Sequence, residues 1–256
     1  MHRRTWLGAT SLGLLQCIGA RGEVPASAPG SPGSPEHPLQ IEVAGRMATN
    51  WVGTQLLMRI YAHAKLAVRI YPVPIGRAAR DLQAGLSDGD GVRIFAYGEG
   101  KPEALRVEPA FYRFTGHAYS LPGRGLRLKT VEDLQHLRVG APANTFWVVG
   151  LIANLPQVFQ AQTHEQLYRM MELGRVDLVL DTQINGRRWS AVTRTPLTES
   201  TELGRFELYH YLHRSHVDLV PRLSGAIRSM QASGELQRLI EVSERVVMTL
   251  GMDQFD

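Results

Sequence analysis

From residue 39 onward, two hydrophobic periodicities alternate along the chain. Leu39–Ala44 alternates apolar and polar positions, as a half-buried strand does, and Ala48–His63 carries its apolar residues at helical spacing. The succession continues with a strand at Ala67–Tyr71, a helix at Ile75–Ala84 and a strand at Gly91–Phe95. This β-α-β-α-β order is typical of parallel strands joined by crossover helices.

A second unit of the same kind follows an extended, aromatic-rich stretch at Phe111–Leu121. The pattern ends in another extended stretch at Leu208–His213 and in two helices, Val217–Ala232 and Leu236–Met248, separated at Gly234. The elements expected in between are a short helix at Val131–Leu134, a strand at Arg138–Ala141, a helix at Thr145–Ala153, a strand at Val158–Gln160, a helix at Thr163–Leu173 and a strand at Val176–Leu180. The sequence therefore predicts two α/β units.

Local signals place some of the helix ends. Thr49 or Asn50 is expected to cap the helix that begins near residue 48. Thr163 and Gln166 have the spacing of a capping box at the start of the helix over 163–173. Gly174 is expected to end that helix, because glycine adopts the left-handed conformation that follows a helix C-terminus.

The first 26 residues have the pattern of an export signal. Arg3 and Arg4 precede an uncharged apolar stretch over residues 6–20, which is too short to span a bilayer comfortably. We expect cleavage after Ala26 and a periplasmic location, by the general secretory route or, given the arginine pair, by the twin-arginine route. Cys17 is either discarded with the signal or lipidated. Residues 27–38 are rich in proline, glycine and serine and are expected to form a flexible or extended linker.

Composition narrows the classes of function. The contents of 44% hydrophobic and 20% charged residues are globular values and exclude a disordered chain. Without Arg3, Arg4, Arg21 and Glu23, the formal net charge falls from +4 to +2, so no nucleic-acid partner is expected. The single cysteine excludes a disulfide within one chain and a cysteine-based zinc site.

Enzyme motifs are missing from the sequence. It contains no G-x-S-x-G, HExxH or Walker pattern. The nine histidines are dispersed except for His210, His213 and His216, which fall where a strand passes into a helix, so their spacing does not place them on one face. We therefore expect no enzyme, no metal site and no cofactor.

Four segments with recognisable motifs occur in one order, followed by the closing helices. They are GRAARDLQAGLSDGDG at 76–91, EPAFY at 108–112, LKTVEDLQHLRVG at 128–140 and THEQLYRMMELGRVDLVLD at 163–181. Together these segments resemble type II periplasmic solute-binding proteins of solute-binding family 3, the polar amino-acid-binding type, as a divergent subgroup. The resemblance covers roughly residues 39–248.

The resemblance implies an α/β fold of two lobes joined by hinge crossovers. Lobe 1 would comprise residues 39–119 and 207–256, and lobe 2 residues 120–206. A small polar solute, an amino acid or an organic acid, would be trapped between the lobes by hinge closure and passed to an ABC-type permease. The protein would act as a monomer. Two alternatives remain open: a binding protein that presents its ligand to a membrane sensor, and a cyclic-acid dehydratase that would use Glu108 or Asp181 as its acid.

The resemblance also implies positions for the ligand's charged groups. Asp181, at the carboxyl end of a buried strand, matches the aspartate that receives the ligand's amino group, or it simply caps the turn that follows. The arginine that pairs with the ligand carboxylate in the family is missing from its usual place, which is taken by Lys101 or, less closely, by Arg106. A lysine attracts a carboxylate but lacks the planar fork that grips it with two parallel bonds.

Other candidates have a structural alternative beside the functional one. Asn144 and Thr145 precede a helix whose free backbone N–H groups would suit an anion, or they simply cap that helix. Trp51 would stack on a ligand or belong to the core, and the same holds for Trp147. Arg77 opens a helix, and Arg93 lies in an apolar strand, where it would pair with Asp88 or Asp90 or meet the ligand. The predicted ligand-binding residues are Trp51, Arg77, Arg93, Lys101, Asn144, Thr145 and Asp181.

Overall fold

The structure is a computed structural model that describes residues 30–251 except 75, 125, 127 and 144. The expected export signal, residues 1–26, lies outside the described residues. Within the described part of the chain, no helix is long and apolar enough to cross a membrane.

The first half has the expected succession of parallel strands and helices. Its elements are β1 (Leu39–Ala44), α1 (Ala48–His63), β2 (Val68–Val73), α2 (Arg77–Gln83) and β3 (Gly89–Ile94). Strand β1 lies between β2 and β3 and is parallel to both, because each connecting helix returns the chain to the same edge. The predicted β-α-β-α-β unit is confirmed.

The second half repeats this arrangement. Strand β5 (Val139–Pro142) lies between β6 (Val158–Ala161) and β7 (Leu178–Thr182) and is parallel to both, and helices α3 (Phe146–Ile152) and α4 (His164–Glu172) connect them. The short helix predicted at Val131–Leu134 is present as a 3-10 helix, and Thr130 and Asp133 form a capping box at its start.

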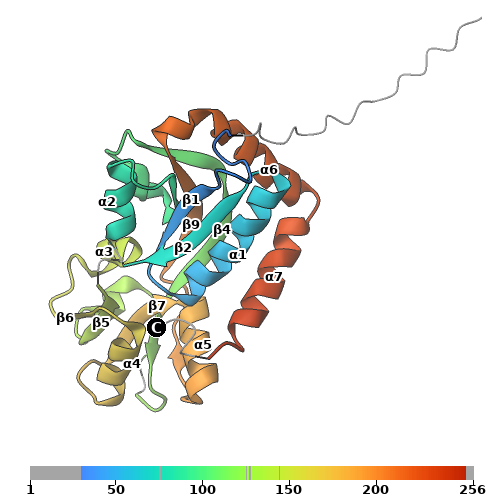
Figure 1. Cartoon of the computed structure of the whole chain (residues 1–256). Coiled ribbons are helices and arrows are strands. Elements are labelled where there is room, and N and C mark those ends of the chain that lie inside the picture. The colour runs from blue at the N-terminus through green and yellow to red at the C-terminus, as the bar shows by residue number, and fades with distance from the viewer. Residues whose placement is uncertain (1–29, 75, 125, 127, 144, 252–256) are drawn as a thin grey trace, which may run out of the picture.

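Two long antiparallel strands join the halves (Figure 1). Strand β4 (Ala104–Ser120) pairs with β9 (Gly204–His213) along most of its length, β9 pairs with β3, and β4 pairs with β7 and with the short β8 (Thr198–Glu199). The strand order is therefore β2-β1-β3-β9-β4-β7-β5-β6, with both crossovers in the middle. The fold is the predicted two-lobed α/β architecture, and the lobe boundaries at residues 119 and 206 stay a prediction.

The chain closes with two helices on lobe 1. A 3-10 helix (Arg214–Leu219) precedes α6 (Val220–Ala232), so the α-helix begins three residues later than predicted, with a proline in its first turn. Helix α7 (Glu235–Val247) follows Gly234, whose φ of +70° makes the expected break. In Figure 1, α7 runs beside α1, and its C-terminal end approaches lobe 2.

The sequence did not predict α5 (Gln183–Thr193), which follows β7 directly. Its sequence, QINGRRWSAVT, carries a glycine and few apolar residues, so it lacks a helical pattern. Tertiary packing forms it: Gly186 lies against the ring of Tyr119, and the ring of Trp189 stacks on Tyr168 with centroids 4.5 Å apart.

Two of the expected helix starts differ in detail. Helix α1 has Met47 at its N-cap with no side-chain bond, and both Thr49 and Asn50 are buried with other partners, so the predicted cap was wrong. Thr163 does cap α4, because its hydroxyl accepts from the backbone N–H of Gln166 at 3.1 Å.

The segment expected to be a free linker is described from residue 30, and there it lies against lobe 1. The backbone N–H of Ala67 donates to the carbonyl of Gly33, and Ser34 is buried. Residues 33–38 are therefore held on the body by these contacts and do not form a flexible spacer.

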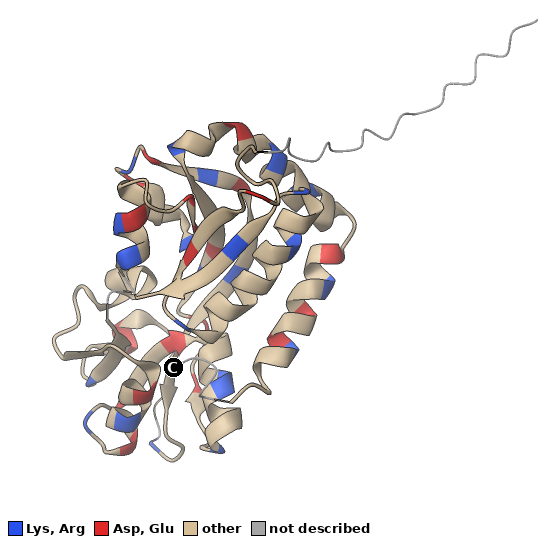
Figure 2. Cartoon of the chain, viewed as in Figure 1, with Lys and Arg blue, Asp and Glu red and all other residues tan. Residues whose placement is uncertain are grey.

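Charged residues are distributed over both halves (Figure 2). The three clustered histidines have separate partners: His210 contacts Tyr61, His213 contacts Ser215, and His216 contacts Asp88. In the described part of the chain, no group of three or more His, Cys, Asp or Glu residues could hold a metal ion.

Candidate functional site

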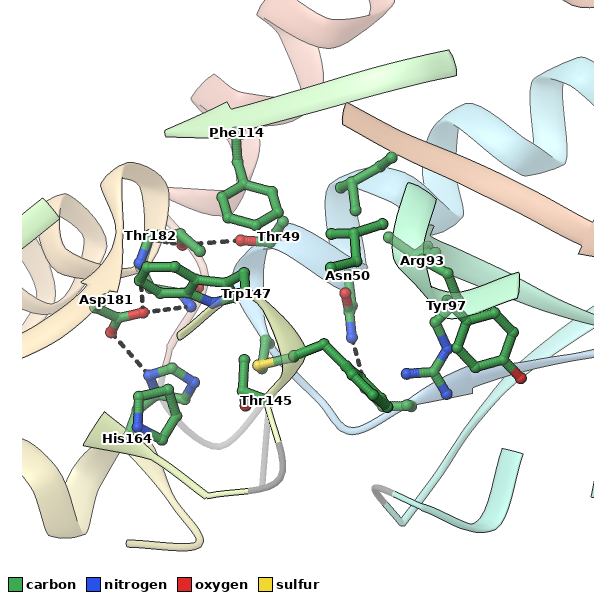
Figure 3. A pocket seen from close by; sticks show the side chains of 18 residues that line it. Thr49, Asn50, Arg93, Tyr97, Phe114, Thr145, Trp147, His164, Asp181 and Thr182 are labelled. Carbon is green, nitrogen blue, oxygen red and sulfur yellow. Dashed lines mark hydrogen bonds and ion pairs between the residues drawn. The ribbon is translucent and has the colours of Figure 1, made fainter. Parts of the chain in front are cut away.

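A pocket of about 80 Å³ lies where the two lobes meet, and both lobes contribute to its walls (Figure 3). Lobe 1 contributes the loop between β1 and α1, the end of β3 and the middle of β4. Lobe 2 contributes the starts of α3 and α4 and the junction of β7 with α5. These junctions lie at the carboxyl ends of parallel strands, which is where ligands bind in open α/β sheets.

The walls are largely apolar. Phe114 of β4 and Trp147 of α3 meet edge to face with their ring centroids 5.8 Å apart, and Phe206 of β9 stacks on Phe114 at 5.2 Å. Gly116 makes this packing possible, because a Cβ built on it would lie 2.5 Å from Cζ3 of Trp147. The crossover strand β4 thus brings the ring of Phe114 to the pocket wall, and Phe206 of β9 packs against that ring.

A buried ion pair lies on the lobe 1 side. Arg93 Nε donates to Asp90 Oδ2 at 2.7 Å, and Nη2 lies 2.7 Å from the same oxygen. The Arg93 side chain is 11% exposed and that of Asp90 is fully buried. Burial raises the pKa of Asp90, an effect that the Arg93 charge opposes. Arg93, which also lines the pocket, thus pairs with Asp90, one of the two partners that the sequence left open.

An irregularity in β3 makes this pairing possible. Residues three apart on a regular strand point to opposite faces. The register between β3 and β9 shifts between Asp90 and Arg93, so their side chains reach the same side of the sheet.

The ring of Tyr97 lies beside this pair. The guanidinium carbon of Arg93 lies 4.7 Å from the centre of the Tyr97 ring, and Lys101 Nζ lies 3.9 Å from it and donates to the Tyr97 carbonyl at 2.6 Å. Phe146 of lobe 2 meets the Tyr97 ring edge to face with centroids 6.4 Å apart. Burial, and then repulsion from Arg93, lower the pKa of Lys101.

Asp181 forms the polar centre of the lobe 2 side. Its Oδ2 accepts from His164 Nδ1 at 2.8 Å and from the Tyr168 hydroxyl at 3.0 Å. Its Oδ1 accepts from the Thr182 backbone N–H at 2.7 Å and from Asn185 Nδ2 at 2.9 Å. The side chain is 1% exposed. Since a carboxylate has about four acceptor positions, residues of lobe 2 occupy all of them.

His164 covers the carboxylate on the pocket side. Because a carboxylate only accepts, the His164 Nδ1 must carry a proton, and the opposite edge of the ring faces the cavity (Figure 3). Burial acts to lower the pKa of His164, but charge attraction to Asp181 and the hydrogen bond between them raise it above its ordinary value.

Polar groups also meet across the lobe interface. The hydroxyls of Thr49 in α1 and Thr182 at the end of β7 lie 2.9 Å apart in a buried position. Asn50 Nδ2 donates to the Ala44 carbonyl at 2.5 Å, which fixes the loop between β1 and α1. The structure therefore shows the lobes in contact.

A larger cavity of about 560 Å³ adjoins the pocket. The two share residues in both lobes: Met47, Pro142, Thr145, His164 and Asn185. This cavity lies between the loops after β1 and β2 and the helices α4 and α5. This cavity leaves space into which the two lobes can move when they close around a ligand.

The structure brings some of the predicted site residues together. Arg93, Thr145 and Asp181 line the pocket, and the ammonium of Lys101 lies over the rings of Tyr97 and Phe146. Asn144 lies outside the described residues.

Other candidates lie elsewhere. Trp51 packs against the lobe 1 core and lines a surface depression beside Tyr71, and Arg77 is an exposed residue of α2 that pairs with Asp81 at 2.9 Å. Arg106 pairs with Glu108 at 2.5 Å on β4, and neither lines the pocket.

Sequence reasoning missed several residues that line the pocket. His164 is the first residue of α4 and follows the correctly predicted cap, Thr163, so its place beside the β-strand ends could have drawn attention to it. Asn185 belongs to the helix that was not predicted, and Tyr97 to the 3-10 helix at Phe95–Gly98. No local signal marks these two residues.

Comparison with known proteins identifies the fold. No family model matches the chain, and no curated protein matches it in sequence. Solved structures do match. With the amino-acid ABC transporter substrate-binding protein AbpA of Streptococcus pneumoniae bound to L-arginine, the TM-score is 0.68 at 14% identity, covering 83% of this chain and 96% of that one.

Two further structures are similar to this chain. The ligand-binding core of GluR0, in complex with L-glutamate, gives a TM-score of 0.71 at 10% identity, covering 80% of this chain and 96% of that one. A histidine kinase sensor domain with similarity to periplasmic binding proteins gives 0.68 at 12% identity, covering 78% and 93%. The chain therefore has the two-lobed type II fold of periplasmic binding proteins.

Proposed function

We propose that the protein is an exported solute-binding protein that captures a small polar solute between its lobes and passes it to an ABC-type importer. One observation carries the proposal. The pocket is lined from both lobes: Arg93, which pairs with the buried Asp90, comes from lobe 1, and the hydrogen-bonded Asp181 and His164 come from lobe 2. Charged groups are costly to bury, so their convergence on one small cavity points to a polar ligand.

The similar structures support this proposal through their ligands. AbpA is described with L-arginine and the GluR0 core with L-glutamate, so both hold a small polar molecule. A monomer that meets a permease at the membrane surface is the assembly we propose. The export signal over residues 1–26 would deliver the protein to the periplasm, and N-terminal sequencing of the secreted form, expected to begin at Ser27, tests this.

A thermal-shift screen tests solute binding. The purified mature protein is heated in the presence of amino acids, organic acids, amines and sugars. At a free ligand concentration of 100 times Kd, the folded state gains about 2.7 kcal/mol, which raises the melting temperature by several degrees. If no small solute raises the melting temperature, the proposal is wrong.

A sensor role is the second candidate, favoured by the similarity to a histidine kinase sensor domain. In that case the ligand-bound form would contact a membrane receptor. Uptake of the labelled solute, compared between cells with and without the gene, separates the two roles, because only the importer role predicts lost uptake.

The dehydratase alternative gains no support from the pocket. Such an enzyme needs an acid that can donate a proton to a leaving hydroxyl. Asp181 accepts four hydrogen bonds from its own lobe, and Glu108 lies outside the residues that line the pocket.

A further inference from the structure

An amino acid presents two charges to a binding site, a carboxylate and an ammonium group. A buried site for it must supply a cation for the first and an acceptor for the second, since an unpaired buried charge is strongly unfavourable. The pocket between the lobes can be tested against both requirements.

The described residues that line the pocket offer no open carboxylate for an ammonium group. Asp181 is the only acidic residue among the described residues that line it, and its four acceptor positions are filled from lobe 2. An ammonium group would have to displace His164 or Asn185 from a carboxylate that is 1% exposed. The Ala44 carbonyl accepts from Asn50 and is neutral, so it does not supply the missing negative charge.

The aromatic faces of Tyr97 and Phe114 do not replace the missing carboxylate. The ring of Tyr97 is contacted by the guanidinium of Arg93 and by the ammonium of Lys101, so it is already engaged by two cations. Phe114 is stacked on Phe206 and meets Trp147 edge to face.

The same pocket offers a cation for a carboxylate. Arg93 lines it, and its Nη2 makes no hydrogen bond in the described part of the chain beyond its ion pair with Asp90 at 2.7 Å. On the opposite side, His164 turns the edge of its ring that does not contact Asp181 toward the cavity (Figure 3). Because Nδ1 donates to Asp181, the other ring nitrogen donates to a ligand only when the ring carries both protons, which the raised pKa of His164 favours.

The net charge of the groups on the lobe 1 side of the pocket also favours an anionic ligand. Arg93 and Lys101 carry two positive charges against the single negative charge of Asp90, whereas His164 and Asp181 form a pair of their own. The net positive charge on the lobe 1 side is suited to one carboxylate. The remaining walls are apolar and aromatic, and the cavity of about 80 Å³ has room for a short apolar body.

We propose that the ligand is a small carboxylic acid that carries no ammonium group, with its carboxylate at Arg93 and its apolar body against Phe114 and Trp147. This inference rests on the proposed solute-binding function and narrows the solute from polar compounds in general to deaminated carboxylic acids. Lys101, whose ammonium lies over the Tyr97 ring, contributes a second positive charge to the site.

Matched ligands of three sizes test the inference. Each set contains an acid, the amino acid with the same carbon skeleton, and the amine left by removing its carboxylate. The sets are propanoate, L-alanine and ethylamine; 3-methylbutanoate, L-valine and 2-methylpropylamine; and 3-phenylpropanoate, L-phenylalanine and 2-phenylethylamine. We expect calorimetric titration of the mature protein to give an acid that binds at least about tenfold tighter than its amino acid and amine.

Two outcomes overturn the inference and are distinguishable from each other. If an amino acid or amine binds as tightly as its acid, the ligand class is wrong while the solute-binding function stands. If none of these compounds binds and no solute of the thermal-shift screen raises the melting temperature, both the ligand class and the proposed function are wrong.

Variants of Arg93 test where the carboxylate of the ligand binds. Arg93→Gln is expected to weaken acid binding by at least about tenfold, because the charge and the guanidinium fork are lost. As this change leaves Asp90 buried without its partner, the double variant Asp90→Asn/Arg93→Gln removes both charges and keeps the test valid if the single variant unfolds. Arg59→Gln is the matched control, since Arg59 is 61% exposed and pairs with Glu235 on the outer surface. Unchanged acid affinity in the folded double variant would refute the role of Arg93.

Discussion

The side-chain oxygens of Thr49 and Thr182 lie 2.9 Å apart in a buried position, although 133 residues separate them in the sequence. Thr49 belongs to the first turn of α1 in lobe 1, and Thr182 ends β7 in lobe 2. This hydrogen bond therefore forms only while the lobes are in contact.

Thr49→Val is expected to favour the open arrangement of the lobes. The change removes one buried hydrogen bond, worth about 0.5–1.5 kcal/mol, which should increase the radius of gyration of the unliganded protein in small-angle scattering. Thr54→Val, on the same helix but outside the pocket lining, is the control and should leave the scattering unchanged. Identical curves for all three proteins would show that this contact does not hold the lobes together.

Arg188 joins the C-terminal chain to lobe 2. From α5, its Nε donates to the Val247 carbonyl at 3.2 Å, and its Nη2 donates to the carbonyls of Leu250 at 2.9 Å and Gly251 at 2.7 Å. Arg188→Gln should lower the free energy of unfolding by about 2–4 kcal/mol, because charge-assisted bonds at a helix C-terminus are lost from a buried site.

The neighbouring arginine provides the control for Arg188. Arg187 is 55% exposed and pairs with Glu199 at 3.0 Å, so Arg187→Gln should cost less than about 1 kcal/mol. Urea unfolding measures both, and equal losses would contradict the structural role of Arg188.

His210 should make the protein sensitive to acid. It is 1% exposed, and burial lowers its pKa to about 4. The unfolded chain binds a proton near pH 6.5 and the folded chain only near pH 4, so this contribution to stability is full above pH 6.5 and is lost as the pH falls toward 4. The loss should be about 3 kcal/mol in chemical unfolding.

A variant tests this assignment. His210 Nδ1 contacts the Asp90 carbonyl at 3.1 Å and Nε2 contacts the Tyr61 hydroxyl at 2.7 Å. His210→Gln retains a donor and an acceptor but does not titrate, so the slope of stability against pH between 6.5 and 4 should become shallower. An unchanged slope would assign the acid sensitivity to other groups.

Trp147 should report ligand binding by fluorescence. Its side chain lines the pocket, whereas Trp51 lies in a surface depression of lobe 1. A ligand is expected to shift or quench the emission of the wild type and of Trp51→Phe but not of Trp147→Phe. A response that survives in Trp147→Phe and vanishes in Trp51→Phe would place the ligand elsewhere.

Gly116→Ala should disturb the same pocket from its floor. A Cβ at residue 116 would lie 2.5 Å from the Trp147 ring, so the ring or β4 must shift, at a cost of about 1–3 kcal/mol. Gly150→Ala, in the same helix as Trp147 but with nothing within 4 Å of the added carbon, should instead stabilise the protein by about 0.5–1 kcal/mol. Thermal melts of both variants check the difference in sign.

The local pattern was sufficient for elements whose own residues carry the signal. Helix α4 buries Leu167, Tyr168 and Met171 on one face, is capped by Thr163 and is followed by Gly174 with φ of +67°, as predicted. It could be predicted because its amphipathic spacing and end signals all lie within a dozen residues. Helix α5 has no such spacing, and its contacts to Tyr119 and Tyr168 come from other elements.

The candidate site also combines features that local sequence determines with features that depend on contacts between distant residues. The sequence by itself determined the alternation of strands and helices, the two-unit organisation and the place of Asp181 and Arg93 on buried strands, because periodicity and burial are local properties. The tertiary structure alone decided that Arg93 pairs with Asp90 through a shift in strand register, and that His164 and Asn185 occupy the carboxylate of Asp181. These partners depend on the register of the strands and on the packing of distant segments. The local pattern of apolar and polar residues does not specify either of them.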